Sequence, residues 1–292
     1  MLDTALHQAA GLSVLGADNT PRIAAVVSHG EPGSEQVLLW QLCLAWVALG
    51  YQVVVLDATQ QESESCPGLL QLLTDDVDLS GLPREGGRGR DADAALGPSG
   101  AYGEPQDRPI IPAAQGLRAL RQIDSGMTGA DSLMTASAAR ARELARIFHG
   151  YELVVLYANA HELALTLPAS SLAPLLPVAA QQADTLTAYH ALKQLLNLGQ
   201  LRPTIITVMD VSAAPTAVTS PSTGLATGVA GQTLQRCARQ FLAHDLPALV
   251  VGPDREAEIN ALALRTLDNA MPASCAIRPT GQAEARIERS LG

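Results

Sequence analysis

The chain has 292 residues, with 19 lysines and arginines against 29 aspartates and glutamates, which gives a formal net charge of −10 at pH 7. The length suffices for one large α/β domain or two smaller ones, and the acidity argues against binding nucleic acid through a general basic surface. The four cysteines form no Cys-x-x-Cys pair, no signal-peptide pattern is evident and no apolar run reaches about 18 uninterrupted residues, so we expect reduced thiols in a soluble, cytoplasmic protein without a membrane anchor.

The first elements along the chain form a strand, a loop, a helix and a second strand. Residues 23–27 are a short apolar run after Pro21 and predict a buried strand. Residues 36–49 are apolar on nearly every side and predict a helix that ends at Gly50. Residues 53–56 predict the next strand. Two apolar strands that flank a helix without alternation indicate a βαβ unit in a parallel sheet covered on both faces.

The composition changes near Pro83. Residues 84–112 are rich in glycine, proline, aspartate and arginine, so we expect a mobile insertion within the domain. Beyond it we expect strands at 153–156, 175–179, 204–208 and 248–251, a loop at 211–231, and helices at 136–149, 184–198, 232–243 and 257–267. Six or seven strands with interleaved helices predict a single doubly wound, mostly parallel sheet, and ligands bind such sheets at the carboxyl ends of the strands.

The loop after the first strand has the sequence HGEPGSE (residues 29–35). A strand, a loop with two glycines, a helix and then YQVVVLDA (51–58) resemble the MinD/ParA class of P-loop ATPases, whose loop is KGGxGKT. In an alignment on the glycines, His29 and Ser34 replace the lysines, Glu31 replaces a glycine and Glu35 replaces the magnesium-binding hydroxyl. The resemblance implies a P-loop NTPase-like α/β domain of MinD/ParA type at 21–270, a helical extension at 1–20 and a C-terminal tail at 271–292.

The chemistry of this loop is unfavourable for ATP. A P-loop holds phosphates with backbone N–H groups and a lysine, whereas Pro32 has no N–H and Lys193, the only lysine, lies on a distant predicted helix. Two negative charges about 5 Å apart at an effective dielectric of about 20 repel by roughly 3 kcal/mol, so Glu31 and Glu35 would oppose a polyphosphate. The resemblance therefore implies a degenerate, inactive nucleotide site at Gly30, Gly33, Ser34 and Asp57. The alternative is a plain strand-to-helix turn with Glu35 as a first-turn acid.

Two further segments match the family in part. YQVVVLDATQQ (51–61) corresponds to the switch segment, with Asp57 retained and Thr59 in place of a second aspartate. YELVVLYANA (151–160) corresponds to the strand whose aspartate positions magnesium and water, and Tyr157 stands there. Because phosphoryl transfer depends on positioning and charge neutralisation, we expect no hydrolysis, no catalytic residue, no metal site and no cofactor. We expect ATP and magnesium to bind only if unorthodox ligands, such as Arg88 and Arg90 or residues of a dimer partner, replace the missing lysines, hydroxyl and aspartate.

The FlhG branch of the family is indicated by two segments. ADTLTAYHALKQL (183–195) resembles a family segment typical of MinD and of FlhG, its flagellar branch. ALHQAAGLSVLG (5–16) resembles the FlhG extension DQAxxLR, with His7 and Ser13 in place of the aspartate and the arginine. This resemblance implies docking on the signal-recognition-type GTPase FlhF through Gln8, Ala9 and Leu12. A frayed N-terminal helix is the alternative.

The leading hypothesis is a non-hydrolysing, FlhG-type protein that acts through protein–protein interaction in flagellar assembly, number or placement. Its partner would be an FlhF-like GTPase or another flagellar or secretion component, and a homodimer is compatible with the resemblance. One alternative is an active but atypical ATPase of the same family. Another is a ParA-like accessory protein of a different secretion or polysaccharide-export system.

Overall fold

The computed structural model describes residues 20–29, 34–63, 66, 68–74, 110–122, 130–179, 182–208, 229–252 and 256–272. Strands and helices alternate along most of this length. In chain order they are β1 (Arg22–Ser28), α2 (Ser34–Ala48), β2 (Val53–Asp57), α3 (Leu69–Thr74), β3 (Ile110–Pro112), α4 (Ala114–Gln122), α5 (Ala130–Ile147), β4 (Leu153–Asn159), α6 (Ala160–Thr166), β5 (Leu175–Ala179), α7 (Gln182–Asn197), β6 (Thr204–Val208), α8 (Val229–Phe241), β7 (Ala248–Val251), α9 (Glu256–Asn269) and β8 (Met271–Pro272).

The strands form one sheet in the order β3-β2-β4-β1-β5-β6-β7, and every neighbouring pair in this order is parallel. The short strand β8 adds to β1 in the antiparallel direction, with Arg22 opposite Pro272. Each parallel neighbour needs a crossover connection, and helices provide these connections on both faces. The predicted fold class, a single doubly wound and mostly parallel sheet, is confirmed.

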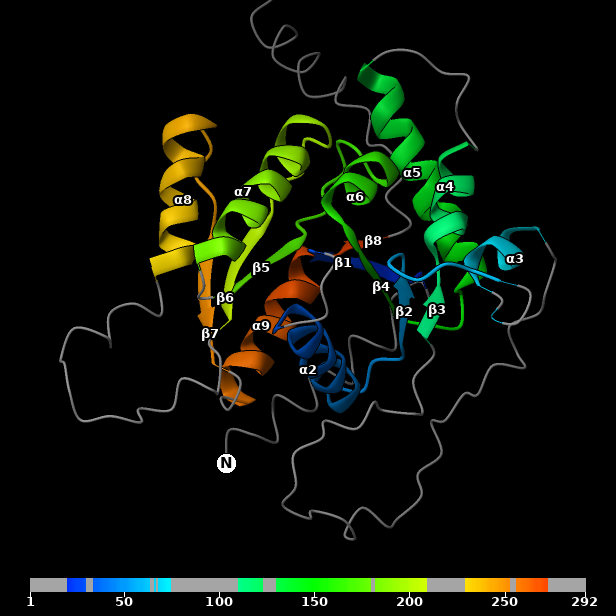
Figure 1. Cartoon of the computed structure of the whole chain (residues 1–292). Helices are drawn as coiled ribbons and strands as arrows, with labels where there is room; N and C mark the ends of the chain where they lie inside the picture. Colours follow the sequence, from blue (N-terminus) through cyan, green and yellow to red (C-terminus); the bar gives the residue numbers. More distant parts are fainter. Residues whose placement is uncertain are drawn as a thin grey trace, which may run out of the picture.

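The helices cover the two faces of the sheet unequally (Figure 1). Helices α2 and α9 lie together on one face, and α3 to α8 lie on the other. Adjacent residues of the central strands point to opposite faces, so each strand contributes to two cores. In β2, Val54 packs toward the α3–α8 side, whereas Val53 and Val55 pack toward α2 and α9. The near-continuous apolar runs of the central strands follow from this double burial.

The sequence predicted most of the sheet. The bounds of β5, β6 and β7 agree with the predicted strands, and the helices predicted after residue 130 are present with shifted ends. Gly50 follows α2 with a φ of +94°, as a C-terminal cap requires. Elements α3, α4 and α6 were not predicted.

Three predicted irregular stretches begin or end differently in the structure. Residues 110–112, assigned to the mobile insertion, form β3 because they pair with β2. Helix α8 begins at Val229, inside the predicted loop, and β8 occupies the first two residues of the predicted C-terminal tail. Residues 1–19, 75–109 and 273–292 lie outside the described residues, and with them the predicted N-terminal helix.

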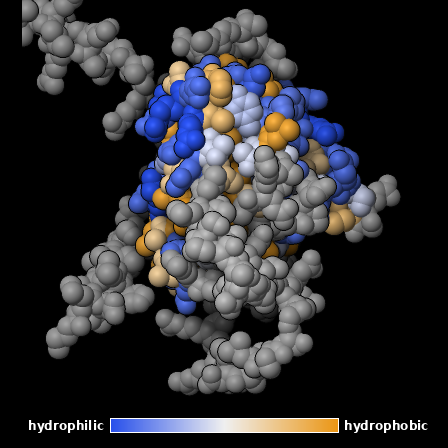
Figure 2. All heavy atoms as spheres, turned by 60° about the vertical axis from the view of Figure 1, so that its left-hand side comes forward, coloured by the Kyte–Doolittle hydropathy of each residue, from blue (hydrophilic) through white to orange (hydrophobic). Residues whose placement is uncertain are grey.

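The described surface is mixed in character on the side of α8. Figure 2 is turned to bring that side forward, and it shows hydrophilic residues over much of the described surface with apolar residues between them. Cys43, Cys66 and Cys237 form no disulfide with one another. Within the described ranges, no helix combines the length and the apolar character needed to cross a membrane.

Candidate functional site

The carboxyl ends of β2, β4 and β1 lie side by side, since these three strands are consecutive in the sheet. Asp57, the last residue of β2, is opposite Tyr157, and Ser28, the last residue of β1, is opposite Asn159. The turns after these strands therefore share one edge, as the sequence predicts for a parallel sheet. This edge is the candidate site.

At the turn after β1, the side-chain carboxylate of Glu35 accepts a hydrogen bond from the backbone. Glu35 lies in the first turn of α2 and is 7% exposed. The backbone N–H of His29 donates a hydrogen bond of 3.0 Å to Oε1 of Glu35. A carboxylate is stabilised at a helix N-terminus by the helix dipole and by unpaired N–H groups. In a phosphate-binding loop, backbone N–H groups face a ligand instead.

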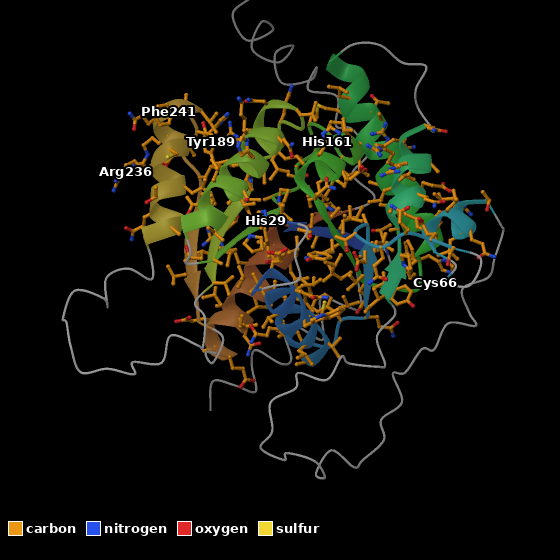
Figure 3. All side chains as sticks on the ribbon, viewed as in Figure 1. His29, Cys66, His161, Tyr189, Arg236 and Phe241 are labelled. Atoms are coloured by element: carbon orange, nitrogen blue, oxygen red, sulfur yellow. The ribbon has the colours of Figure 1, made fainter. Side chains whose placement is uncertain are left out.

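The ring of His29 is tied to a neighbouring strand. Its Nε2 lies 2.8 Å from the carbonyl oxygen of Pro177 in β5. A carbonyl oxygen only accepts hydrogen bonds, so Nε2 is the ring nitrogen that carries a hydrogen atom and donates the hydrogen bond. Figure 3 shows His29 near the middle of the sheet, well away from Arg236 and Phe241 on α8 and from Cys66 near α3. The His29 ring is thus hydrogen-bonded within the protein itself.

Asp57 is also engaged locally. It is 6% exposed, and its Oδ1 accepts hydrogen bonds from the backbone N–H of Thr59 at 2.9 Å and from the Thr59 hydroxyl at 2.6 Å. This is the arrangement of an Asx turn, in which an aspartate side chain stabilises the turn that follows it. Both donors belong to Thr59, which therefore occupies Oδ1 of Asp57.

Tyr157 lies among these acidic groups and stays protonated. It is 5% exposed, and burial is the main reason why its pKa rises from 10.0 to about 12. The hydrogen bond between the Tyr157 and Ser28 side chains lowers this pKa, while the negative charges of Glu35 and Asp57 raise it further. A neutral phenol stands where the resembling ATPases carry a magnesium-positioning aspartate.

The charge of the described edge is negative. Within residues 26–29, 34–38, 55–63 and 155–159, Glu35, Asp57 and Glu62 are acidic and no residue is lysine or arginine. Across the described ranges, no group of three or more histidine, cysteine, aspartate or glutamate side chains is placed to hold a metal ion. In the described part of the site, hydrogen bonds from the protein hold the carboxylates of Glu35, Asp57 and Glu62 in place.

Several predicted site residues are not placed. Gly30 and Gly33 lie outside the described residues. Ser34 opens α2, but its side chain is not described. Gln8, Ala9 and Leu12, predicted to bind a partner, also lie outside the described residues. Of the predicted nucleotide residues, Asp57 is therefore the one whose side-chain contacts are established.

Sequence reasoning missed Glu62. Its Oε1 accepts hydrogen bonds from the backbone N–H groups of Leu70 at 3.3 Å and Gly116 at 2.8 Å, and its Oε2 accepts one from Gln115 at 2.6 Å. One carboxylate thereby joins the first turns of α3 and α4 to the segment after β2. The sequence offered no signal for this role, because neither helix was predicted.

Three solved structures align with most of the chain at low identity. Cobyrinic acid a,c-diamide synthase from Mycobacterium smegmatis is 14% identical, covers 85% of this chain and 94% of its own, and has a TM-score of 0.46. A Cyanothece McdA–ATP complex is 13% identical, with coverages of 87% and 94% and a TM-score of 0.42. A ParA family ATPase from Chlorobium tepidum is 12% identical, with coverages of 86% and 92% and a TM-score of 0.40.

These TM-scores are all below 0.5, so the description of the fold rests on the order and direction of the strands. No protein-family model matches the sequence. No curated protein matches it either.

Proposed function

We propose that the chain is a ParA/MinD-like protein of FlhG type that binds partner proteins without hydrolysing ATP, in flagellar assembly, number or placement. The strand order, the helix after the first loop and the partial motifs support the family. The FlhG branch and the flagellar role rest on the residue matches at 5–16 and 183–195.

One observation carries the non-hydrolysing part of the proposal. The N–H of His29, at the start of the candidate phosphate loop, already donates to the buried carboxylate of Glu35. A phosphate arriving there would have to displace Glu35 or lie beside it. At about 5 Å and an effective dielectric of about 20, the repulsion is roughly 3 kcal/mol, which corresponds to about a hundredfold weaker binding. Tyr157 supplies no charge for magnesium, because its raised pKa keeps it neutral.

Titration of the full chain with ATP and magnesium tests this part. We expect no saturable heat and no phosphate release above that of a buffer blank. Glu35→Gln is the matched variant, because it removes the charge and retains an oxygen that accepts from His29. It should not restore hydrolysis, since Tyr157 is unchanged. Micromolar binding or turnover by the unaltered chain would contradict the proposal and favour an atypical ATPase.

A separate measurement tests the partner. A purified FlhF-type GTPase, loaded with a non-hydrolysable GTP analogue, should bind the immobilised full chain, and Leu12→Asp should abolish this binding. Arg202→Gln, just before β6, is a suitable control, because this exposed residue lies outside both matched segments. If the GTPase fails to bind while nucleotide binding is also absent, the flagellar assignment is wrong but the non-hydrolysing assignment stands.

A further inference from the structure

Helix α4 is held at both ends by carboxylates from two of the turns at the candidate site. At its start, Glu62 in the segment after β2 accepts hydrogen bonds from the backbone N–H groups of Gln115 and Gly116. In its last turn, Arg121 forms an ion pair of 2.7 Å with Glu162. Glu162 lies in the first turn of α6, which directly follows β4. The helix therefore joins the turn after β2 to the turn after β4.

The contact at the start of α4 is closely packed. The carboxylate of Glu62 also accepts from the backbone N–H of Leu70, so it binds N–H groups of two helices, α3 and α4. A Cβ at Gly68 would overlap Cγ of Glu62. A Cβ at Gly116 would lie 2.5 Å from Cβ of Leu69. The two glycines thus allow α3 and α4 to approach each other around the Glu62 side chain.

The contact at the other end of α4 is partly buried. The side chains of Arg121 and Glu162 are 18% and 14% exposed, so salt screens this ion pair less than it screens a surface pair. Arg118, one turn earlier on α4, lies 3.8 Å from the same carboxylate. The backbone N–H of Glu162 donates to Oδ1 of Asn159, the last residue of β4. The start of α6 is therefore bound both to α4 and to the end of a site strand.

A third side chain fastens α4 to α6. Arg140 of α5 is 8% exposed, and its guanidinium donates to three carbonyl oxygens. The acceptors are Arg121 near the end of α4, and Leu165 and Thr166 at the end of α6. Carbonyls at helix ends lack partners within the helix, so one buried cation satisfies the ends of both helices. Helix α4 accordingly packs against α6 as well as against α3 (Figure 1).

We propose that α4 is a coupling element, which locks the turn after β2 to the turn after β4 so that the two turns are released together. Contacts run without a break from Glu62 through α4 to Glu162. Helix α4 has nine residues, too few for a stable isolated helix, so it unfolds when one end is freed. A ligand or partner that displaced Glu62 would therefore also loosen the start of α6. The proposal does not depend on the proposed function.

Hydrogen exchange of the unaltered full chain, at low concentrations of urea, tests the coupling directly. If α4 is released as a unit, the amides of Gln115, Gly116 and Glu162 should open with the same equilibrium constant, within about twofold, and with the same dependence on urea. The amide of Leu192 is the comparison and should open only in global unfolding, because Leu192 is fully buried on α7. Opening constants at the two ends of α4 that differ by more than about tenfold would overturn the proposal.

A double-mutant cycle tests the same coupling through urea unfolding. Glu62→Gln weakens the contact at the start of α4, and Arg121→Gln removes the ion pair at its end. If either change releases the helix, the double variant should change the unfolding constant by about the larger single effect and not by the product of the two. Glu62→Gln combined with Leu42→Ala is the control, and these effects should multiply, because Leu42 lies in the other core.

The two measurements together keep the proposal open to contradiction. Effects that multiply in both pairs of variants would show that the ends of α4 act independently, and the coupling would then be wrong. The exchange measurement needs no variant, so it decides the question even if Glu62→Gln does not fold.

Discussion

Tyr157 shows how one residue changes the chemistry of an entire strand end. A carboxylate there would face Glu35 and Asp57 and would need a cation to offset three negative charges. The phenol forms a hydrogen bond with the Ser28 side chain, and it remains neutral because burial and the two carboxylates raise its pKa to about 12. A neutral phenol at this position thus avoids a third negative charge beside Glu35 and Asp57.

The raised pKa predicts how stability changes at alkaline pH. The unfolded phenol ionises near pH 10.0 and the folded one near 12, so its stabilisation is fully present below pH 10 and is lost as the pH rises through 12. The loss should approach about 3 kcal/mol well above pH 12, and roughly half of it should be present at about pH 11. We expect Tyr157→Phe to abolish this part of the alkaline destabilisation, as measured by urea unfolding at about pH 8 and about pH 11.

The same variant has an expected effect at neutral pH. Tyr157→Phe should unfold about 1 kcal/mol more easily, because the hydrogen bond to Ser28 is lost. The other tyrosines are present in both proteins, so the difference between the two pH profiles isolates Tyr157. Parallel profiles for the unaltered chain and the variant would refute the assignment.

Part of the candidate site could be predicted from sequence and part could not. The replacements at the loop and at Tyr157 are visible in an alignment of short motifs, and the sequence placed the turns at one edge. The contacts of His29 with Pro177, and of Glu62 with Gln115, join residues 148 and 53 positions apart. No local pattern specifies such pairs, because they depend on which strands become neighbours.

At the scale of elements, the short helices were the hardest to predict. Helices of six to nine residues, such as α3 and α4, are unstable alone and form because they pack on the sheet. Gly116 lowers the helical signal of α4 further. The structure explains its presence, since a Cβ at Gly116 would lie 2.5 Å from the Cβ of Leu69 in α3. A long apolar strand such as β4 needs no such partner to be recognised.

Glu62 is expected to hold α3 and α4 in place. Glu62→Gln keeps the shape of the side chain but replaces one acceptor oxygen with a donor and removes the charge at two helix starts. We expect a loss of about 1–2 kcal/mol in the free energy of unfolding, measured by urea denaturation. Glu143→Gln is the matched control, because Glu143 pairs with Arg146 on the exposed side of α5. Loss of this ion pair should lower the free energy of unfolding by less than about 0.5 kcal/mol. Equal effects of the two variants would rule out the joining role of Glu62.

At the scale of the whole molecule, the sheet separates two apolar cores and also connects them. The core beneath α3 to α8 contains Leu144, and the core beneath α2 and α9 contains Leu42; both side chains are fully buried. Neighbouring residues of one strand, such as Val154 and Val155, enter different cores. Loss of packing on one face therefore loosens the strands on which the other core is built.

This connection predicts that the two cores unfold together, while substitutions in different cores change the free energy of unfolding independently of each other. Leu42→Ala and Leu144→Ala should each destabilise the fold by about 2–5 kcal/mol. Because the two residues lie on opposite faces of the sheet, the double variant should show the sum of the two losses within about 0.5 kcal/mol. Both tryptophans, Trp40 and Trp46, lie on α2, so their fluorescence follows the smaller helical layer, while far-ultraviolet circular dichroism follows all the helices. The two signals should give the same urea midpoint in every variant, because shared strands make the layers unfold together. If Leu144→Ala lowers the dichroism midpoint and leaves the fluorescence midpoint unchanged, the two cores are separate folding units and the sheet does not couple them.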